Sequence, residues 1–599
     1  MDGYTPFPIF DFASGIYSAK QPWLAPKDAF QDILNAYIEK GVIKKRKGYV
    51  EFGRFVHQVV ETIGTGTAGG QKTFSFTLTK TPIRTDVSVT DSVETFTDNG
   101  DGTLTGDAGG TGTIDYTSGA ISVTFHAAPA ESQNVDCAYN YYPGNPIMGL
   151  VEHKAADSSL SLLAFDTKRM CKYNTTTKVL DDVSTSDTWT GSDEQFFRFC
   201  NSSYGDLYIT NAKDQIQKYD GSTLAAFVID TDGNASNNID TCRWIFEYKD
   251  HLIILAPTED GTLYPRRYRC SEAIDYTSWP AANYVDCPTD DEIISARMIG
   301  DILYVWFKES LWKLVYVGYT SNPFEWQCVS TEEGSLAPMS TVEIPGNKAL
   351  TIGKTSIVGT DMYTAFSAND QADDLTLKYS QDKIALSYAA RVRELKQVWF
   401  TMCKVGSTSP DAMIVYNYKD GSYFTYDLPL TCIGFYAEQN TLTIDDISDV
   451  IDTISWAFDD ISLQAGFPIT LGGSSTGYIY KLNYGYNDNG EAIELTLDGN
   501  EWNPYVQQGR MARLGYIDIY HKSLSAGTLT VDCFANTEPD AYKSVTIDLT
   551  EAQMDKKFTR LKIGCVANFH RIKIYHDEAD RDVQIEMITP WFKAEGPIR

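Results

Sequence analysis

Short apolar and aromatic runs, separated by polar turns, fill the middle of the chain. Residues 241–328 contain two blocks with the same order of runs, and Gly, Asp, Asn or Lys separates each run from the next. This pattern predicts consecutive antiparallel strands. Leu252 follows Leu207 by 45 residues, and Leu303 follows Leu252 by 51. Because four-strand units that recur at about 40–50 residues are typical of β-propeller blades, residues 147–486 are predicted to form a propeller of six or seven sheets.

Two further segments have a different rhythm. Residues 60–146 are dense in Gly and Thr and alternate with period two, which predicts a small β-sandwich inserted in the main fold. Residues 487–599 form longer alternating runs and predict a C-terminal β-sandwich. The predicted fold class is therefore all-β, with a β-propeller core and two added sandwiches.

The first 59 residues are predicted to form an arm, one helix and a first strand. The arm is aromatic and rich in Pro. After Pro26, apolar residues at 30, 33, 34, 37 and 38 recur at helical spacing, and Gly41 follows them. This spacing predicts one short N-terminal helix that ends at Gly41. The run from Gly48 to Phe52 then predicts a strand.

The overall charge limits the partners. Lys and Arg number 50 against 80 Asp and Glu, so the formal net charge is −30. A chain this acidic is repelled by phosphate and is not expected to grip nucleic acid or an anionic membrane. Its 11 cysteines contain no CxxC pair and predict reduced core cysteines made in a cytoplasm. Neither an export signal nor a membrane-spanning segment is predicted.

An acidic repeat stands out within the predicted propeller. Residues 444–462 contain three similar five-residue units, spaced seven apart. Their apolar positions fit a helical seam, but Asp, Ser and Thr also fit three capped turns. Either arrangement presents several aspartates together, and a solvated acidic loop is the plainer alternative. These aspartates are Asp445, Asp446, Asp449, Asp452, Asp459 and Asp460.

One dense basic cluster precedes the strand at Gly48. It consists of Lys44, Lys45, Arg46 and Lys47. One interpretation is a solvated turn. The other is a contact with an acidic neighbour, such as a second copy of this acidic chain.

Motifs for catalysis do not fit their required contexts. Gly473–Gly477 matches G-x-S-x-G, but a strand follows where a nucleophile elbow needs a helix, so a hairpin turn is predicted. In the segment Gly66–Thr73, Gln71 occupies the position of an essential glycine of a phosphate-binding loop. No His pair has zinc-site spacing, and no spacing singles out a carboxylate pair for glycoside hydrolysis. The chain is predicted to be no enzyme and to hold no metal or cofactor.

Taken together, these patterns resemble the β-propeller nozzle or stabilisation proteins (tail tubular protein B-like) in the tails of short-tailed bacteriophages. The resemblance rests on the block Pro26–Tyr49, Arg266–Ser271 with Trp279, Lys308–Leu314, Glu333–Ala337, the 444–462 repeat and Gly477–Leu482. It implies a virion protein, assembled in the host cytoplasm, that forms a hexameric ring below the tail adaptor and beside tail fibre proteins.

The same resemblance implies that the ring's channel retains and conducts the genome. DNA would then pass without sequence-specific binding, and the six aspartates of the repeat are expected to face the channel. An alternative is a tail-borne or secreted propeller that binds or cleaves host surface polysaccharide, which requires a cleft with Trp and paired carboxylates. A monomeric WD or kelch-type scaffold is a third alternative, but its Trp-Asp or Gly-Gly signatures are missing.

Overall fold

The protein is built almost entirely from β-strands. The computed structural model describes residues 3–598 except 185, 232–237, 320, 369, 373, 438–467, 523–526 and 550–556. Its helical elements within these residues are short 3-10 turns: η1 (Pro22–Leu24), η2 (Thr376–Lys378), η3 (Gln381–Leu386) and η7 (Val506–Gln508). The predicted all-β class with a propeller core is confirmed.

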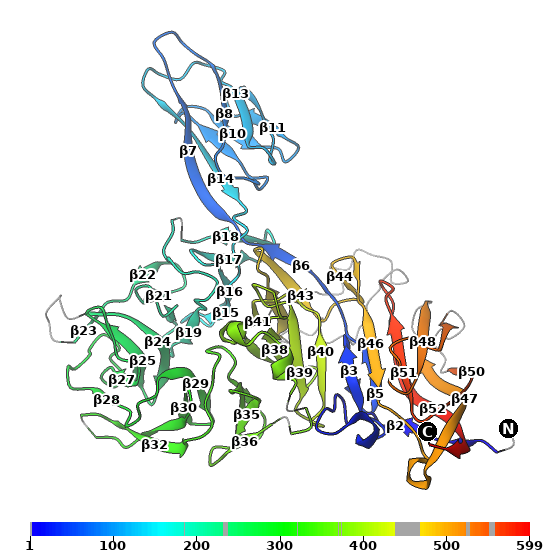
Figure 1. Ribbon diagram of the computed structural model, residues 1–599. Coiled ribbons are helices and arrows are strands. Elements are labelled where there is room, and N and C mark those ends of the chain that lie inside the picture. Colours follow the sequence, from blue (N-terminus) through cyan, green and yellow to red (C-terminus); the bar gives the residue numbers. More distant parts are fainter. Residues whose placement is uncertain are drawn as a thin grey trace.

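Six small sheets form six positions of the propeller ring (Figure 1). The first five follow one another along the chain. They contain β15 (Gly149–Lys154), β16 (Leu160–Phe165), β17 (Met170–Asn174) and β18 (Val179–Asp182); β19 (Arg198–Asn201), β20 (Leu207–Thr210), β21 (Gln217–Tyr219) and β22 (Leu224–Ala226); β23 (Ile229–Asp230) to β28 (Tyr284–Asp286) around β24 (Asn238–Tyr248), β25 (His251–Glu259) and β27 (Arg267–Cys270); β29 (Ile293–Ile299), β30 (Ile302–Phe307), β31 (Leu311–Tyr316) and β32 (Phe324–Ser330); and β33 (Val342–Ile344), β34 (Lys348–Ile352), β35 (Ile357–Thr360) and β36 (Ala365–Ser367).

The sixth small sheet is completed by the N-terminal part of the chain. It begins with β41 (Cys432–Tyr436), β42 (Ile469–Gly473) and β43 (Tyr478–Leu482), and β43 pairs with β6 (Tyr49–Arg54). The short strands β44 (Asn487–Asp488) and β45 (Glu491–Ala492) extend it. Because β41 also contacts β15 of the first blade, this sheet closes the ring.

One end of a nine-stranded sheet occupies a seventh position in the propeller ring. Its strands β37 (Ala389–Val392), β38 (Gln397–Met402), β39 (Ala412–Asn417) and β40 (Tyr423–Tyr426) lie between the fifth and sixth small sheets, since β37 contacts both β33 and β41. The same sheet then continues out of the propeller through β3 (Phe30–Leu34), β46 (Leu495–Gly499), β51 (His570–His576), β48 (Thr528–Ala535) and β49 (Lys543–Asp548).

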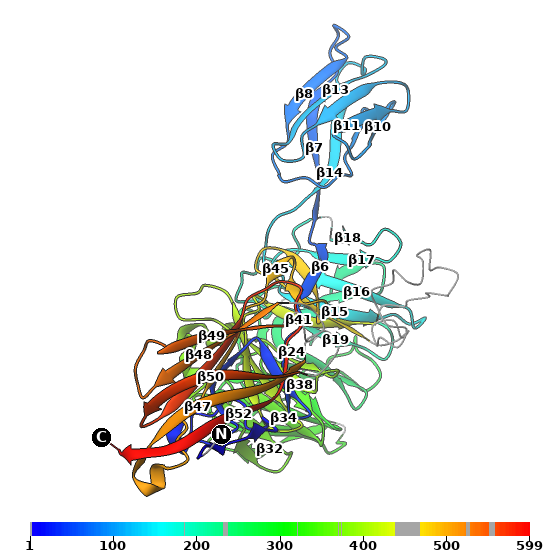
Figure 2. The same cartoon turned by 90° about the vertical axis from the view of Figure 1, so that its right-hand side faces the viewer.

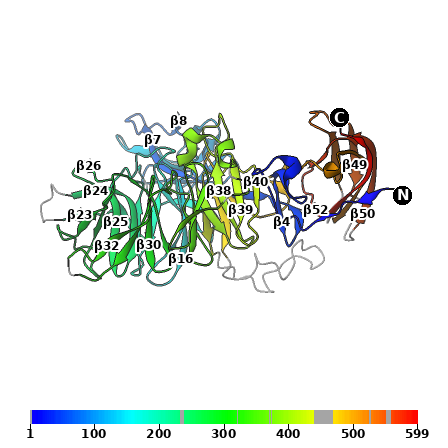
Figure 3. The same cartoon turned by 60° about the horizontal axis from the view of Figure 1, so that its bottom comes forward.

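The outer half of that sheet is one layer of the C-terminal unit. The facing layer contains β4 (Ala36–Glu39), β5 (Val42–Lys45), β52 (Gln584–Pro597), β47 (Arg510–Lys522) and β50 (Lys557–Ala567), with β1 (Thr5–Pro6) and β2 (Ile9–Phe10) paired to β52. Both layers pack into one hydrophobic cluster, which continues into the propeller. Figures 1 and 3 show this unit beside the propeller, with both chain ends on it.

The inserted segment forms a module that projects from the propeller (Figure 2). It is one eight-stranded sheet, from β7 (His57–Thr65) and β14 (Asn134–Tyr141) round to β8 (Thr73–Thr77). The sheet curls into a barrel-like shape because its edge strands β7 and β8 contact each other, and its intervening strands are β9 (Ser88–Thr90), β10 (Thr95–Asp98), β11 (Thr103–Gly106), β12 (Thr111–Ile114) and β13 (Ala120–Thr124). Period-two alternation places apolar residues on one face in a sandwich and a barrel alike, so the pattern did not separate the two.

The predicted N-terminal helix is wrong. Its residues form β3 and β4, and Asn35 between them has a left-handed backbone (φ 55°). The apolar residues are largely buried, as helical spacing suggested, but β3 and β4 bury them in the two opposite layers of the C-terminal unit. Pairing of β3 with the distant strands β40 and β46 overrides the local spacing.

Gly48, which links β5 to β6, tests how tightly the N-terminal segment is enclosed. A β-carbon there would lie 1.7 Å from the carbonyl oxygen of Asn487, a backbone atom that cannot swing away. We expect Gly48→Ala to lower the free energy of unfolding by roughly 3 kcal/mol in urea denaturation. Gly53→Ala in β6 is the control, because its β-carbon would make ordinary contact with the Leu180 side chain at 3.6 Å. Equal stability of the two variants would contradict the close enclosure of this segment.

Candidate functional site

A cavity of about 290 Å³ lies at one end of the propeller. It is surrounded by the residues that lead into the innermost strands of four blades. Pro146, Phe196, Leu386 and Thr431 come shortly before β15, β19, β37 and β41. Together with other lining residues they form what we call the mouth cavity. The other lining residues are Asp193, Thr408, Ser409, Pro410 and Ser475.

Hydroxyl groups and one carboxylate supply the polar surface of the mouth cavity. Thr431 is already engaged, since its Oγ1 donates to the carbonyl of Ile147 at 2.5 Å. Asp193 and Thr408 are exposed, and Ser409 is half-buried. Groups of this kind, on a partly apolar wall, hydrogen-bond to polyols and other small polar molecules.

Aromatic packing borders the mouth cavity. The Tyr388 ring lies 5.9 Å from the ring of buried Phe196, measured between centroids. Met339 packs against the same hydrophobic cluster.

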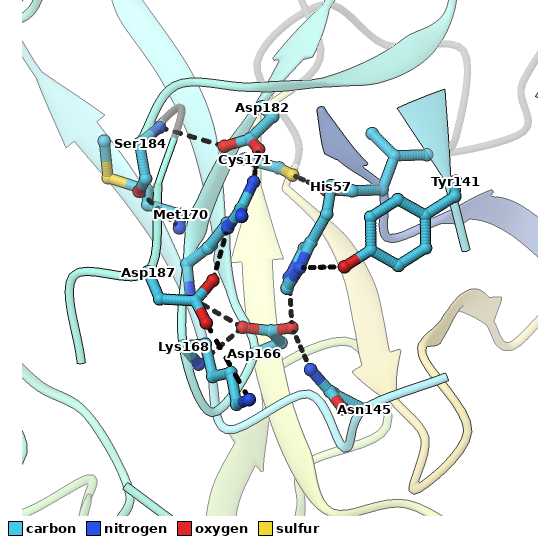
Figure 4. A network of polar contacts seen from close by, with 12 residues as sticks. His57, Tyr141, Asn145, Asp166, Lys168, Met170, Cys171, Asp182, Ser184 and Asp187 are labelled. Atoms are coloured by element: carbon cyan, nitrogen blue, oxygen red, sulfur yellow. Dashed lines mark hydrogen bonds and ion pairs between the residues drawn. The ribbon is translucent and has the colours of Figure 1, made fainter. Parts of the chain in front are cut away.

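A buried polar network joins the inserted module to the first blade (Figure 4). His57 Nε2, at the start of β7, lies 2.7 Å from Asp166 Oδ2, and Asn145 Nδ2 donates to the same oxygen at 2.8 Å. The other oxygen, Oδ1, accepts the backbone N–H groups of Lys168 and Arg169, both at 2.7 Å. Since His57 and Asp166 are both buried, this pair lies out of reach of a substrate and holds the module in place.

Arg169 extends this network to the edge of the blade. Its Nη1 donates to the carbonyl of Gln58 and to Asp182 Oδ2, both at 2.8 Å, and its Nε donates to Asp187. Gln58 also donates its backbone N–H to Asp182. The first two residues of β7 are thus tied to the propeller by charge-assisted hydrogen bonds, which are stronger than neutral ones.

Two residues of the predicted basic cluster are buried inside the chain. The Lys45 ammonium lies 3.2 Å from His576 Nδ1 and donates to the carbonyl of Glu578; burial lowers its pKa to about 8. Lys44 is paired with Glu39 at 2.7 Å, and Lys47 is exposed. The proposed contact with a neighbouring subunit is therefore corrected for Lys45 and Arg46, whose partners belong to the same chain.

Arg46 uses all five of its N–H donors. Nη1 and Nη2 form a two-pronged ion pair with Asp488 at 2.8 and 2.6 Å. Nη1 also donates to the carbonyl of Lys47, and Nη2 to that of Asp427. Nε donates at 2.7 Å to Asn35 Oδ1, which accepts the Asp427 N–H as well. This cluster therefore links β3, β6, the β40 end and the segment after β43.

The remaining sequence predictions concern the acidic repeat, the G-x-S-x-G turn, metal sites and membrane-spanning segments. The six aspartates Asp445, Asp446, Asp449, Asp452, Asp459 and Asp460 lie outside the described residues. Residues 474–477 form the predicted hairpin turn, between β42 and β43, and Ser474 Oγ accepts the Tyr478 N–H at 2.9 Å. In the described part of the chain, no group of three or more His, Cys, Asp or Glu side chains could hold a metal ion. None of the helices described there is long and apolar enough to cross a membrane.

Sequence reasoning missed the mouth cavity. Its residues come from six separate stretches, and Ser475 is the only one of them that belongs to a motif considered above, the G-x-S-x-G match. The useful signal was positional, because several of them directly precede the first strand of a predicted blade. To use that signal one must know which strand of each blade is innermost. Strand pairing in the folded structure decides this.

Comparisons with known proteins give only distant similarity. No family model matches the chain, and no curated protein matches it. Among solved structures, the extracellular domain of a putative hybrid two-component system from B. thetaiotaomicron is 12% identical, with a TM-score of 0.27. The match covers 64% of this chain, which spans half the length of that one.

Two glycoside hydrolases also appear. An exo-β-1,3-galactanase from Phanerochaete chrysosporium is 10% identical over 75% of this chain and 95% of its own, with a TM-score of 0.20. A glycoside hydrolase family 43 arabinoxylan arabinofuranohydrolase from Bacillus subtilis is 8% identical over 76% and 96%, with a TM-score of 0.21. These matches contradict the prediction that the chain is not an enzyme, and we withdraw that prediction. At these TM-scores they assign neither an activity nor a substrate.

Removing Arg46 tests the buried cluster. We expect Arg46→Met to lower the free energy of unfolding by roughly 3–5 kcal/mol, because the half-buried Asp488 would lose its counter-charge. The double variant Arg46→Met/Asp488→Leu should recover much of that loss, since it removes both charges. Chemical denaturation of the three proteins measures the coupling. Additive losses in the double variant would show that the ion pair does not hold these segments together.

Proposed function

We propose that this chain is a ring-forming subunit of the tail nozzle of a short-tailed bacteriophage, assembled in the host cytoplasm and located in the virion tail below the adaptor. The observation that carries the proposal is the nine-stranded sheet shared by the propeller and the C-terminal unit. The resemblance of the sequence to nozzle proteins supports it independently. In this role the chain would contact its own copies, the adaptor and tail fibre proteins.

The shared sheet suits a subunit that must keep its shape while a genome moves past it. Between the two units, β3 pairs with β40 on one side and with β46 on the other, so backbone hydrogen bonds cross the boundary. The buried Arg46 cluster crosses at the same place. A boundary built this way lacks the flexible linker that permits relative motion of domains.

The DNA path would lie between subunits. In this proposal the ring of subunits forms the opening through which DNA passes. A net charge of −30 disfavours adhesion of phosphate, which allows DNA to pass without sequence-specific binding. In this proposal the six aspartates of residues 444–462 face the opening.

The assembled mass tests the ring. Light scattering of the purified chain should give six times 66.8 kDa, in a concentration-dependent equilibrium with smaller species. A chain that stays monomeric at every concentration, and also alongside the adaptor, would contradict the proposal.

Charge reversal tests the DNA path. Phage particles in which the six aspartates are changed to Lys should eject DNA more slowly, by roughly tenfold or more, because phosphate would adhere to the opening. Asp101→Lys and Asp115→Lys, on the exposed surface of the inserted module, are the controls. Ejection that is unchanged in the sixfold variant would count against these residues facing DNA.

The mouth cavity supports a second candidate function, the binding or cleavage of host surface polysaccharide. Its hydroxyls and the Asp193 carboxylate are suited to sugar hydroxyl groups. Asp193→Ala should then weaken saccharide binding measured by calorimetry, and release of reducing ends would measure cleavage. A monomer that binds saccharide through Asp193 would favour this function over the nozzle.

A further inference from the structure

Arg198 is a buried cation without an acidic partner. It is the first residue of β19 and only 6% exposed. Its Nη1 donates at 3.3 Å to the carbonyl of Phe196, a residue that lines the mouth cavity, and its Nε has no partner. Among the described residues, no carboxylate lies within ion-pair distance of this guanidinium.

The other buried arginines of the propeller are different. Arg169 is paired with Asp182 and Asp187, and Arg269 forms a two-pronged ion pair with Glu259 at 2.7 and 2.8 Å. Arginine is almost never fully buried without such a partner. The lack of a partner at Arg198 is therefore a property of this position, and it needs a physical explanation.

A second cation lies on β24, the strand that packs against β19. The Arg198 guanidinium stands over the ring of Trp244, 5.1 Å from the centroid, and Arg243 is the neighbouring residue on β24. Arg243 donates to Glu292 at 2.8 Å and to the Ile293 carbonyl at 2.5 Å, and a quarter of its side chain is exposed. Burial, and then the charge of Arg243, lower the pKa of Arg198 to about 10, so Arg198 is still charged at neutral pH.

The charge of Arg243 opposes that of Arg198, and Arg198 lacks a counter-charge. A buried charge costs several kcal/mol unless an opposite charge compensates it. Glu292 compensates the charge of Arg243, so the charge of Arg198 remains uncompensated. A small anion bound to this pair would supply the missing charge and accept the free N–H donors.

We propose that Arg198 and Arg243 form a binding site for a small oxyanion, a phosphate or carboxylate group, between the second and third blades. The planar guanidinium matches two oxygens of such a group, and Trp244 supports it from one side. The site does not depend on the nozzle or on the polysaccharide function. A free phosphate ion and the carboxylate of an acidic sugar share the required chemistry.

Titration of the whole protein with inorganic phosphate, at constant ionic strength, tests this site. The melting temperature of the wild type should rise with phosphate and reach a plateau, as expected for binding to the folded state. Arg198→Met should abolish this dependence. Without phosphate its melting temperature should equal or exceed that of the wild type, because an uncompensated buried charge is gone.

Arg269→Met is the matched control. It removes a buried arginine that has its own carboxylate, so the variant should melt earlier but keep the phosphate response. A wild type that does not respond, or an Arg198→Met protein that responds like the wild type, would overturn the proposal.

Two more measurements keep the test independent of the stability of one variant. Arg243→Met, at a partly exposed position, should weaken phosphate binding by tenfold or more in calorimetry, and unchanged affinity would overturn the site. Glucuronate should compete with phosphate because it carries a carboxylate. Competition by uncharged glucose would show that hydroxyl groups, and not an oxyanion, are recognised.

Discussion

The buried guanidinium of Arg46 is the interaction on which the arrangement of the units depends. It binds Asp488, Asn35 and the backbone carbonyls of Lys47 and Asp427 with all of its donors. These partners come from the N-terminal strands, the propeller and the segment that leads into the C-terminal unit. Removal of a fully bonded, buried charge leaves several polar groups unsatisfied at once, so one side chain fixes three distant parts of the chain.

The two ends of the chain are used as structural parts of distant units. β6 completes a propeller sheet, and β3 continues the nine-stranded sheet into the C-terminal unit. Propeller, sandwich and N-terminal arm therefore form one body. The inserted module is the exception, since it departs from this body through β7 and β14 alone and is held by the His57–Asp166 network.

Buried and exposed charged side chains of this protein differ in how they are compensated. Most buried cations have a carboxylate of their own chain, as Arg169 and Arg269 do, and the large acidic excess is left to the surface. In the proposed nozzle, that excess would keep DNA from adhering. Arg198 departs from the rule, and its place beside the propeller mouth makes the departure informative.

The sequence alone determined the strand content and the propeller, because alternating apolar runs and Gly or Asn turns act within a few residues. It also determined the hairpin turn at 474–477, since a strand follows the serine. Only tertiary structure decided that residues 30–38 form two strands, because β40 and β46 offer them hydrogen bonds that no local signal reveals.

The candidate sites were decided by tertiary structure as well. A run of four basic residues predicts a charged surface, yet Asp488 and His576, far along the chain, draw Arg46 and Lys45 into the interior. The mouth cavity and the Arg198 pair depend on which strand of each blade is innermost. That choice follows from packing between blades, and such packing acts between residues that sequence spacing does not relate.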